Sequence, residues 1–324
     1  MVDYSIIIPT HNSVTSIKRC INAILNSIFD KEFEIIIVDD ASQDGTVDLI
    51  KKMKVNLIKN DQCLGPAKTR NIGTHFAKGE IFVFIDSDVL VNPDTLQKID
   101  DFFTDEKEFV GLSCNLEPKC EMKDFFSRYK NLYTCFSKLD KSQSVAWAYT
   151  STFAIKKNAF YDVGGFNESI NQHEDDFIGW ELVSKGYKIA FCNSLLVNHI
   201  HKHTFYSFLK ERILRSRIRA IMKLTGFFLN IKLRKEPLAA KTVYGLLIFP
   251  FLIVGLCLSS VSGLFLLIPA IIFYSVSMEY LRFCKIFFGI KFMILAAFML
   301  PLDYAFCWLG IISGVFDYIG GKRI

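Results

Sequence analysis

Apolar and polar positions follow two alternating patterns over the first 85 residues. Short apolar runs occupy residues 5–8, 33–38, 55–58 and 81–85, and polar or turn-forming residues bound each run, as they bound buried strands. Between these runs the apolar residues recur at helical spacing, and the clearest case is Ile17, Ile21, Ile24, Leu25 and Ile28. This alternation predicts an α/β fold with a parallel sheet and helices on both of its faces.

The part of the chain between residues 120 and 195 continues this domain. Residues 147–155 and 186–191 predict two further strands, and a helix is expected to begin at the acidic stretch 173–176. The aromatic residues of 123–138 have three- and four-residue spacing, which favours a packed helix over a platform for stacking sugars.

Beyond residue 205 the chain becomes basic. Four cations recur on one face of a predicted helix: Arg212, Arg215, Arg219 and Lys223. A basic amphipathic helix of this kind is expected to lie in the headgroup plane of a membrane, where anionic lipid attracts it. The alternative is that the basic face binds acids of the protein itself.

After about Lys241 the charges nearly vanish, which predicts membrane-spanning segments. Residues 242–260 and 261–277 are expected to form a hairpin. Residues 292–312 would form a third span or, because Pro301 and Asp303 interrupt them, a re-entrant hairpin. Basic residues flank the apolar part on both sides, so both ends are expected in the cytosol. This predicts a multi-pass protein of the cell (inner) membrane with a cytoplasmic catalytic domain.

Composition adds little to this picture but agrees with it. The chain has 324 residues, 51% of them hydrophobic, and a formal net charge of +5. Its nine cysteines form no C-x-x-C pair, which predicts reduced thiols and a cytosolic catalytic part. The residues before the first strand lack the basic region of a signal peptide, so no such peptide is expected.

Carboxylates stand at the ends of two predicted strands. Asp39 and Asp40 close the second strand, and Asp86 and Asp88 close the fourth. If the strand pairing persists, the last two share one face and could bind Mg²⁺ or Mn²⁺ that carries a phosphate-bearing substrate. The alternatives are an Asp-rich turn for the second pair and helix capping for the first.

Two common nucleotide-binding motifs are absent from the sequence. Neither G-x-G-x-x-G nor a Walker A loop follows the first strand. Arg70, in the helix before the fourth strand, could instead fork onto a pyrophosphate. Taken singly, this arginine could equally be half of a surface ion pair.

Six motifs, in order, carry a resemblance to a known family. They occupy residues 7–12, 38–46, 65–73, 86–88, 164–168 and 174–175. Over about residues 4–200 the chain resembles a family 2 glycosyltransferase with the GT-A fold, which is Rossmann-like with a mostly parallel sheet. The resemblance implies three parts: a catalytic domain at 1–204, a basic amphipathic segment at 205–241 and a membrane domain at 242–324.

The resemblance also implies a donor site. Thr10, Asp40 and Arg70 would hold the nucleotide of a nucleotide-diphosphate sugar, with Asp39 nearby. Further donor-binding positions would be Pro9, Asn12, Asp86, Ser87 and Gly165. At Gly165 a tight glycine loop lets backbone approach the sugar.

The resemblance implies a metal and a base beside the donor. Asp88, assisted by Asp86, would bind Mn²⁺ or Mg²⁺ in a DXD motif. His199 or His201 would reach the metal or the diphosphate, although the histidines at 199, 201 and 203 could also be interpreted as a zinc site. Asp175 would be the general base of an inverting displacement.

These expectations describe a membrane-anchored glycosyltransferase. Its acceptor would be a lipid-linked sugar or glycan in envelope polysaccharide or glycolipid synthesis, or a polyprenyl phosphate. Membrane lipids are expected partners, and no nucleic-acid partner is expected. Three rivals remain: a non-catalytic sugar-nucleotide sensor, a processive synthase and a nucleotidyltransferase. Phe177 and Glu181 depart from the common family pattern, which bears on the acceptor more than on catalysis.

Overall fold

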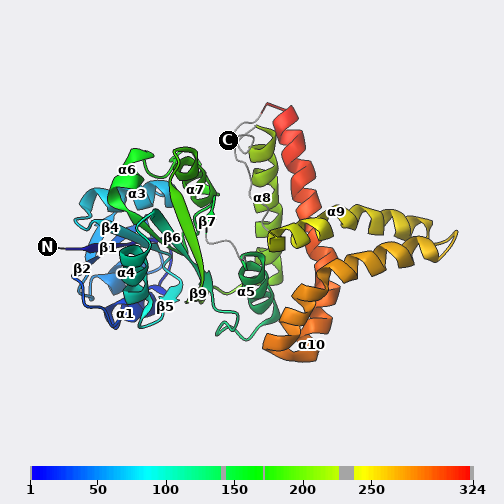
Figure 1. The fold of residues 1–324 in the computed structure, drawn as a ribbon, viewed down its shortest axis with the longest axis horizontal. Coiled ribbons are helices and arrows are strands. Elements are labelled where there is room, and N and C mark those ends of the chain that lie inside the picture. The colour runs from blue at the N-terminus through cyan, green and yellow to red at the C-terminus, as the bar shows by residue number, and fades with distance from the viewer. Residues whose placement is uncertain (1, 140–143, 171, 226–236, 322–324) are drawn as a thin grey trace. The chain divides into compact units, whose positions relative to one another are not determined.

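The computed structural model describes residues 2–139, 144–170, 172–225 and 237–321. The chain divides into two compact units, which Figure 1 draws as a ribbon. The first unit comprises Met1–Glu117 and Ser142–His201, and the second comprises Pro118–Lys141 and Lys202–Ile324. The three-part division expected from the sequence stays a prediction.

The first half of the sheet is parallel, as the sequence predicts. Its strands are β1 (Tyr4–Thr10), β2 (Phe33–Asp39), β3 (Asn56–Lys59) and β4 (Ile81–Ile85), in the spatial order β3-β2-β1-β4. The connecting helices are α1 (Ile17–Leu25), α2 (Thr46–Ile50) and α3 (Pro66–Phe76). Because these strands are parallel, their carboxyl ends meet at one edge of the sheet, where α/β folds place their ligands.

The second half of the sheet is mixed. β8 (Thr152–Lys156) is antiparallel to both β4 and β6 (Phe109–Leu116), and β6 runs parallel to β9 (Lys188–His199). Two short strands, β5 (Val89–Val91) and β7 (Ser144–Val145), pair antiparallel with β9. The remaining helices of this unit are α4 (Thr95–Asp105), α6 (Lys157–Asp162) and α7 (Glu174–Ser184). The β5–β9 pairing sets Val89 opposite His199 and so brings the histidine segment to the end of β4.

The core beside this sheet is built from phenylalanines. Phe82 and Phe84 alternate along β4 and are fully buried. Their rings contact those of Phe160 and Phe166, with centroids 5.0 to 5.6 Å apart. Aromatic pairs at these separations add to the burial energy and fix the loop at 164–166 against the sheet.

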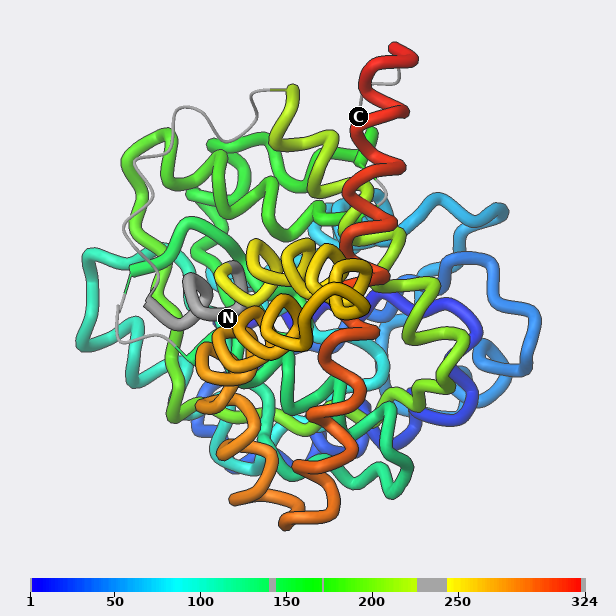
Figure 2. Tube along the Cα trace, turned by 90° about the vertical axis from the view of Figure 1, so that its right-hand side faces the viewer, coloured from blue at the N-terminus to red at the C-terminus, as the bar shows by residue number. Residues whose placement is uncertain are grey.

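The second unit is helical. It contains α5 (Phe125–Ser137), α8 (Phe205–Leu224), α9 (Pro237–Leu258) and α10 (Leu264–Ile319). α9 and the first part of α10 run side by side as a hairpin, yellow to orange in Figures 1 and 2. α10 bends at Gly289, whose φ of 84° is not helical, and then continues through Pro301. The two segments form neighbouring helices, as the predicted hairpin requires, but that both cross a membrane stays a prediction. Residues 292–312 form one continuous helix rather than a pair of short segments.

Among the described residues, one helix, α10, is long and apolar enough to cross a membrane. The described apolar part of α9, Tyr244–Leu258, is shorter. The sequence expectation of a membrane segment is supported to that extent.

Aromatic residues of α5 lie in the core of the second unit. Tyr129 and Phe136 are buried with Phe208 of α8 and Tyr280 of α10. The tyrosine ring contacts those of Phe208 and Tyr280 at centroid distances of 5.7 and 5.9 Å. The prediction that 123–138 forms a packed helix is therefore confirmed.

Two arginines of α8 are bound to the protein's own acids. Arg212, from the predicted basic face, pairs with Asp303, which has no exposed surface. Arg217, which is not one of the four cations of that face, pairs with Asp317. Glycines of α10 let the two helices approach, since a Cβ at Gly310 or Gly314 would lie 2.3 or 2.4 Å from a carbonyl oxygen of α8. The expectation of a basic face directed wholly to lipid is therefore wrong for Arg212, because its charge pairs with the buried Asp303 inside the unit.

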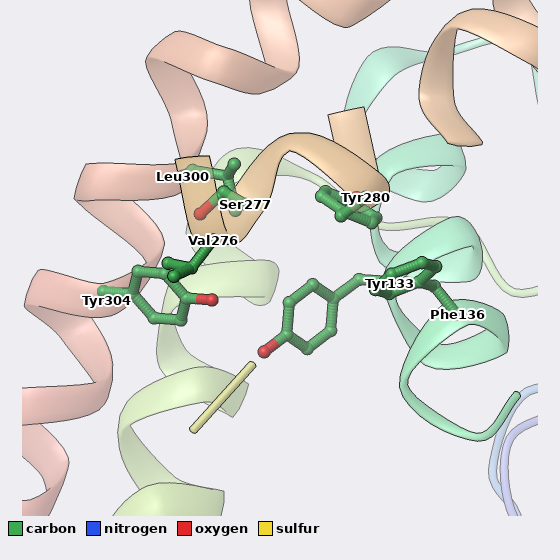
Figure 3. Close-up of a pocket in the computed structure, with 7 residues that line it drawn as sticks. All are labelled: Tyr133, Phe136, Val276, Ser277, Tyr280, Leu300 and Tyr304. Carbon is green, nitrogen blue, oxygen red and sulfur yellow. The ribbon is translucent and has the colours of Figure 1, made fainter. Parts of the chain in front are cut away.

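A small cavity lies between α5 and α10 in this unit (Figure 3). Its volume is about 10 Å³, and its lining includes Tyr133, Ser277 and Tyr304. Such a space holds about one water molecule. This cavity is too small for a substrate. The acids predicted to bind a substrate lie at the edge of the sheet in the first unit.

Candidate active site

The segment 86–88 is a turn and does not continue β4. The strand ends at Ile85, and the Val89 amide donates to the Asp86 carbonyl at 3.0 Å. The expectation that Asp86 and Asp88 share a strand face is therefore wrong. The turn directs their carboxylates to different partners on different elements.

Asp88 lies between two imidazoles. Its carboxylate is 3.0 Å from His201 Nδ1 and 3.4 Å from His199 Nε2, and its carbonyl accepts from the Ile200 amide at 2.8 Å. Burial would raise the pKa of this carboxyl, but the two histidines hold the pKa well below its ordinary value. Asp88 is therefore ionised at neutral pH.

Asp86 faces Arg70 of α3. The guanidinium is only 4% exposed; one terminal nitrogen lies 2.7 Å from Asp86 Oδ1 and the other 2.7 Å from Glu174 Oε1. It also lies over the Phe166 ring, 5.5 Å from its centroid. The interpretation of Arg70 as half of a surface ion pair is thus wrong, since it is a buried bridge between two acids.

The acids at this bridge are partly desolvated. Burial raises the pKa of Asp86, which Arg70 opposes and Asp88 reinforces. Burial likewise raises the pKa of Glu174; Asp175 raises it further, and Arg70 lowers it. At each carboxyl, Arg70 is the charge that most opposes this rise in pKa.

The neighbouring Asn71 holds the glycine loop. Its side-chain amide donates to the Phe166 carbonyl at 2.8 Å and accepts from the Phe166 amide at 3.0 Å. Gly165 has a φ of 74°, and a Cβ there would lie 2.9 Å from Asn71 Oδ1. A packing constraint therefore already requires glycine at position 165, before any donor is considered.

Asp40 is occupied by its own chain. Its carboxylate accepts from the amides of Leu64 and Gly65 at 2.8 and 2.9 Å, and from Asn60 Nδ2 at 2.9 Å. Burial raises the pKa of Asp40, but these hydrogen bonds outweigh it and lower the pKa. Asp40 therefore organises the loop before α3, which its assignment as a donor ligand did not anticipate.

Asp39 and Thr10 keep unused polar atoms. They are opposite each other in the β1–β2 register. Asp39 Oδ2 accepts from the Ser42 amide at 3.0 Å. Asp39 Oδ1 and Thr10 Oγ1 are buried and have no hydrogen-bond partner within the part of the chain that the structure describes. Unpaired buried polar atoms are costly, so this pair is a candidate for ligand contact.

The other predicted donor positions help to form the same loops. Asn12, with a φ of 50°, accepts from the Gln43 amide at 2.8 Å and so ties the end of β1 to the loop after β2. Ser87 Oγ is 2.8 Å from Ser13 Oγ, and Pro9 lies within β1 opposite Val38. These residues shape the edge of the sheet.

Asp175 lies in the first turn of α7 and is half-buried. It follows Glu174, whose carboxylate the Arg70 bridge links to Asp86 in the turn 86–88. The ligand atoms of His173, Asp175 and Asp176 lie within 4.8 Å of one another and could hold a metal ion. His173 Nδ1 is 2.8 Å from Asp176 Oδ2, and Asp175 Oδ1 accepts from the Asp176 amide at 2.9 Å.

The donor atoms at the turn 86–88 suit a divalent cation. An ionised carboxylate with two adjacent imidazole nitrogens is a mixed oxygen and nitrogen set, which fits Mn²⁺ and related ions. Of the three predicted ligands, the structure brings Asp88 and His199 together and turns Asp86 to Arg70. His201, left open by the sequence, lies closer to Asp88 than His199 does.

Sequence reasoning missed the roles of Asn71 and Glu174. Both lie within recognised motifs, but their partners are about a hundred positions away in the chain. For Asn71 one signal was available. It lies in α3 among small residues that are buried, Ala67, Gly73 and Thr74, and such neighbours indicate that a polar side chain there enters the interior.

Comparisons with known proteins agree with this geometry. The family model described as "Glycosyl transferase family 2" matches residues 5–168. Poly(ribitol-phosphate) beta-N-acetylglucosaminyltransferase TarS of Staphylococcus aureus is 36% identical over 104 residues, which are 30% of this chain and 18% of TarS. The pre-mycofactocin glycosyltransferase of Mycobacterium tuberculosis is 24% identical over 214 residues, 62% of this chain and 43% of that protein.

A third relative has a lipid-linked sugar in its name. The UDP-Glc:alpha-D-GlcNAc-diphosphoundecaprenol beta-1,3-glucosyltransferase WfaP of Escherichia coli is 41% identical over 87 residues, 26% of this chain and 34% of WfaP. The matches thus span less than half the length of each of these three relatives.

Two solved structures share the fold. The mannosyltransferase PcManGT of Pyrobaculum calidifontis, in complex with GDP-Man and Mn²⁺, superposes with a TM-score of 0.62 at 18% identity, covering 97% of this chain and 87% of that one. S. aureus TarS 1-349 with UDP-GlcNAc gives 0.52 at 18% identity, covering 99% and 93%. At this identity the likeness concerns the fold alone.

Proposed function

The chain belongs to glycosyl transferase family 2, and we propose that it transfers a sugar from a nucleotide-diphosphate sugar to a lipid-linked or glycan acceptor, with inversion. One observation carries the proposal. Two acid-bearing segments, the turn 86–88 and the first turn of α7, converge on the buried Arg70 at the carboxyl edge of the parallel strands. This is the edge where α/β folds bind their ligands.

The donor binds across the ends of β1, β2 and β4. The Thr10 hydroxyl donates to the nucleoside or accepts from it, and the Asp39 carboxylate oxygen accepts from it. Asp88, His199 and His201 would hold Mn²⁺ or Mg²⁺. When bound, this ion supplies a positive charge that stabilises the departing nucleoside diphosphate. The relatives crystallised with GDP-Man and Mn²⁺ and with UDP-GlcNAc support a donor and an ion of these classes.

Asp175 acts as the general base. The acceptor oxygen attacks the anomeric carbon on the face opposite the diphosphate, the bond from that carbon to the diphosphate oxygen breaks, and the acceptor proton moves to the Asp175 carboxylate. One displacement inverts the configuration. A base in the first turn of a packed helix is held in a fixed position, and its half-buried carboxylate remains accessible to an acceptor.

The second unit anchors the enzyme to the cell (inner) membrane, with the catalytic unit on the cytoplasmic side. The support is the apolar length of α10, the exposed apolar side chains of the α9–α10 hairpin and the basic residues that flank it in the sequence. A membrane position suits an acceptor that is itself lipid-linked, and the printed name of WfaP supports that class.

A polyprenyl phosphate is the second candidate acceptor. A phosphate nucleophile needs no base, so Asp175 would then only position it. Asp175→Asn separates the cases: with a hydroxyl acceptor transfer is lost, whereas with a phosphate acceptor it continues.

The test is transfer by membranes that contain the protein, with Mn²⁺ or Mg²⁺, across a panel of UDP-, GDP- and dTDP-sugars and extracted lipid. Metal-dependent transfer into the lipid phase, abolished in Asp88→Ala, is the expected result. Metal-dependent donor binding without turnover on any lipid would favour a sugar-nucleotide sensor.

A further inference from the structure

We infer that Glu174, acting through Arg70, is a positioning residue that fixes the base-bearing turn of α7 relative to the metal-binding turn 86–88. The inference rests on the proposed function, because it assigns Asp175 and Asp88 their roles. Glu174 itself touches no reacting atom in this scheme.

The geometry supplies the link between the two turns. Arg70 lies in α3, Asp86 follows β4 and Glu174 begins α7, and both contacts are 2.7 Å long. Glu174 is one residue from the base, and Asp86 is two residues from Asp88. A single guanidinium therefore spans the two segments whose separation the displacement depends on.

Arg70 is fixed by more than its two acids. Phe166 lies beneath the guanidinium, and the hydrogen bonds of Asn71 hold Phe166 by its backbone. The planar guanidinium can bond both carboxylates only in one orientation. The bridge thus defines one relative placement of the turns instead of a range.

The same geometry argues against a grip on the donor diphosphate. A bidentate contact with phosphate uses two parallel N–H bonds, and each terminal nitrogen of Arg70 already donates to a carboxylate. Its Nε is buried without a partner among the residues that the structure describes. The arginine is enclosed by the protein, which suits an internal strut and not an open anion site.

Breaking the bridge between Arg70 and Glu174 is expected to lower the turnover rate and to leave donor binding unchanged. A displacement of about 1 Å in catalytic geometry can cost about 100-fold in rate. The donor contacts at Thr10 and Asp39 and the ligand atoms at Asp88 lie on other elements and keep their places. A change confined to α7 therefore lowers kcat while donor KM and metal affinity persist.

The experiment compares Glu174→Gln with Asp162→Asn in the full chain. Both replace one carboxylate with its amide, but Asp162 ends α6 in an exposed ion pair with Lys185. We expect Glu174→Gln to lower kcat about 10- to 100-fold for the nucleotide sugar that the wild type uses, with KM changed less than about threefold. Asp162→Asn should match the wild type. Titration with Mn²⁺ alone, followed by electron paramagnetic resonance, should give the same Kd for all three proteins.

Coupling is the second readout. Arg70→Lys and Glu174→Gln break the same bridge, so the double variant should lose no more kcat than the worse single variant. Losses that multiply would overturn the inference, as would an unchanged kcat in Glu174→Gln, or a loss that falls on KM or on the Mn²⁺ Kd. If Glu174→Gln does not fold, Glu174→Asp, which keeps the charge and shortens the reach, replaces it with the same expectations.

Hydrogen exchange separates this inference from the proposed function. Amides of 174–178 should exchange faster in Glu174→Gln than in the wild type or in Asp162→Asn, whether or not a substrate is known. Unchanged exchange in this turn would refute the positioning role even if the enzyme is active. If the wild type transfers no sugar, but the exchange of this turn still differs between the wild type and Glu174→Gln, the proposed function is refuted and the positioning role is not.

Discussion

Removal of Asp303 should destabilise the second unit far more than removal of Asp317. Asp303 is fully buried, and its carboxylate accepts from Arg212, with one contact at 2.9 Å, and from the Tyr129 hydroxyl at 3.1 Å. Breaking a buried pair by removing one partner costs about 3–5 kcal/mol. Because the Arg212 side chain retains 21% exposure, we expect the lower end, about 3 kcal/mol, for Asp303→Leu.

The neighbours of the pair decide how much can be recovered. Arg212→Met with Asp303→Leu removes both charges and keeps the volume, and such replacements are often neutral or stabilising. The double variant still leaves the Tyr129 hydroxyl without its acceptor, at about 1–3 kcal/mol. Adding Tyr129→Phe removes that cost, so the triple variant should approach the wild-type stability.

Thermal unfolding of the purified chain in detergent measures these differences. About 3 kcal/mol should lower Tm by about 6–12 °C, at 2–4 °C per kcal/mol for a unit of this size. Asp317→Leu is the matched control: Asp317 is 14% exposed and its partner Arg217 is 36% exposed, so water can replace part of the lost interaction and the cost should be about 1 kcal/mol. Equal losses in Asp303→Leu and Asp317→Leu, or a triple variant no more stable than Asp303→Leu, would refute the reasoning.

Three further outcomes test the site and the packing. Gly165→Ala should lower the free energy of unfolding, measured by chemical denaturation, by about 2–3 kcal/mol, since φ is 74° and Asn71 Oδ1 would lie 2.9 Å from the Cβ. Gly164→Ala is the control, with a φ of 81° but open space around the Cβ, and it should cost only about 1 kcal/mol. Gly314→Val should cost at least about 3 kcal/mol in the same assay, because its Cβ would lie 2.4 Å from the Arg217 carbonyl, whereas Gly263→Val meets nothing within 4 Å and should cost less. His201→Ala should weaken Mn²⁺ binding about 10-fold or more, and an unchanged Kd beside a large loss in His199→Ala would assign the metal to the other histidine.

The sequence predicts the parallel half of the sheet because one pattern, an apolar run followed by a helix, repeats along residues 4–85. Each apolar run in β1 to β4 is joined to the next by a helix, and right-handed crossovers leave little choice of arrangement. β5 and β8 are different, since β5 pairs with residues more than a hundred positions later and β8 returns antiparallel to β4. Their short apolar runs carry no mark of those partners.

The candidate site follows the same division. Motifs locate the acids, but not the direction of their side chains. The rule that residues i and i+2 share a face holds within a strand, and it failed at Asp86 and Asp88 because the chain turns there. Asp40 matches the expected motif, yet its carboxylate oxygens accept hydrogen bonds from the amides of Leu64 and Gly65. The spacing of basic residues in α8 likewise could not reveal Asp303, which lies 91 positions from Arg212.

Arg70 and Arg212 each hold a buried acid, and the two acids differ in where they lie. Arg70 bridges Asp86 and Glu174, with side chains 29% and 10% exposed, at the edge of the sheet, whereas Asp303 beside Arg212 has no exposed surface and lies in the helical unit. Glu174→Gln keeps a side-chain oxygen that accepts from Arg70, so it should cost more in kcat than in stability. Asp303→Leu leaves no acceptor for Arg212, so it should lower Tm while the protein that remains folded keeps its kcat. If both variants changed Tm and kcat in the same proportion, the place of the acid would not be what distinguishes the two bridges.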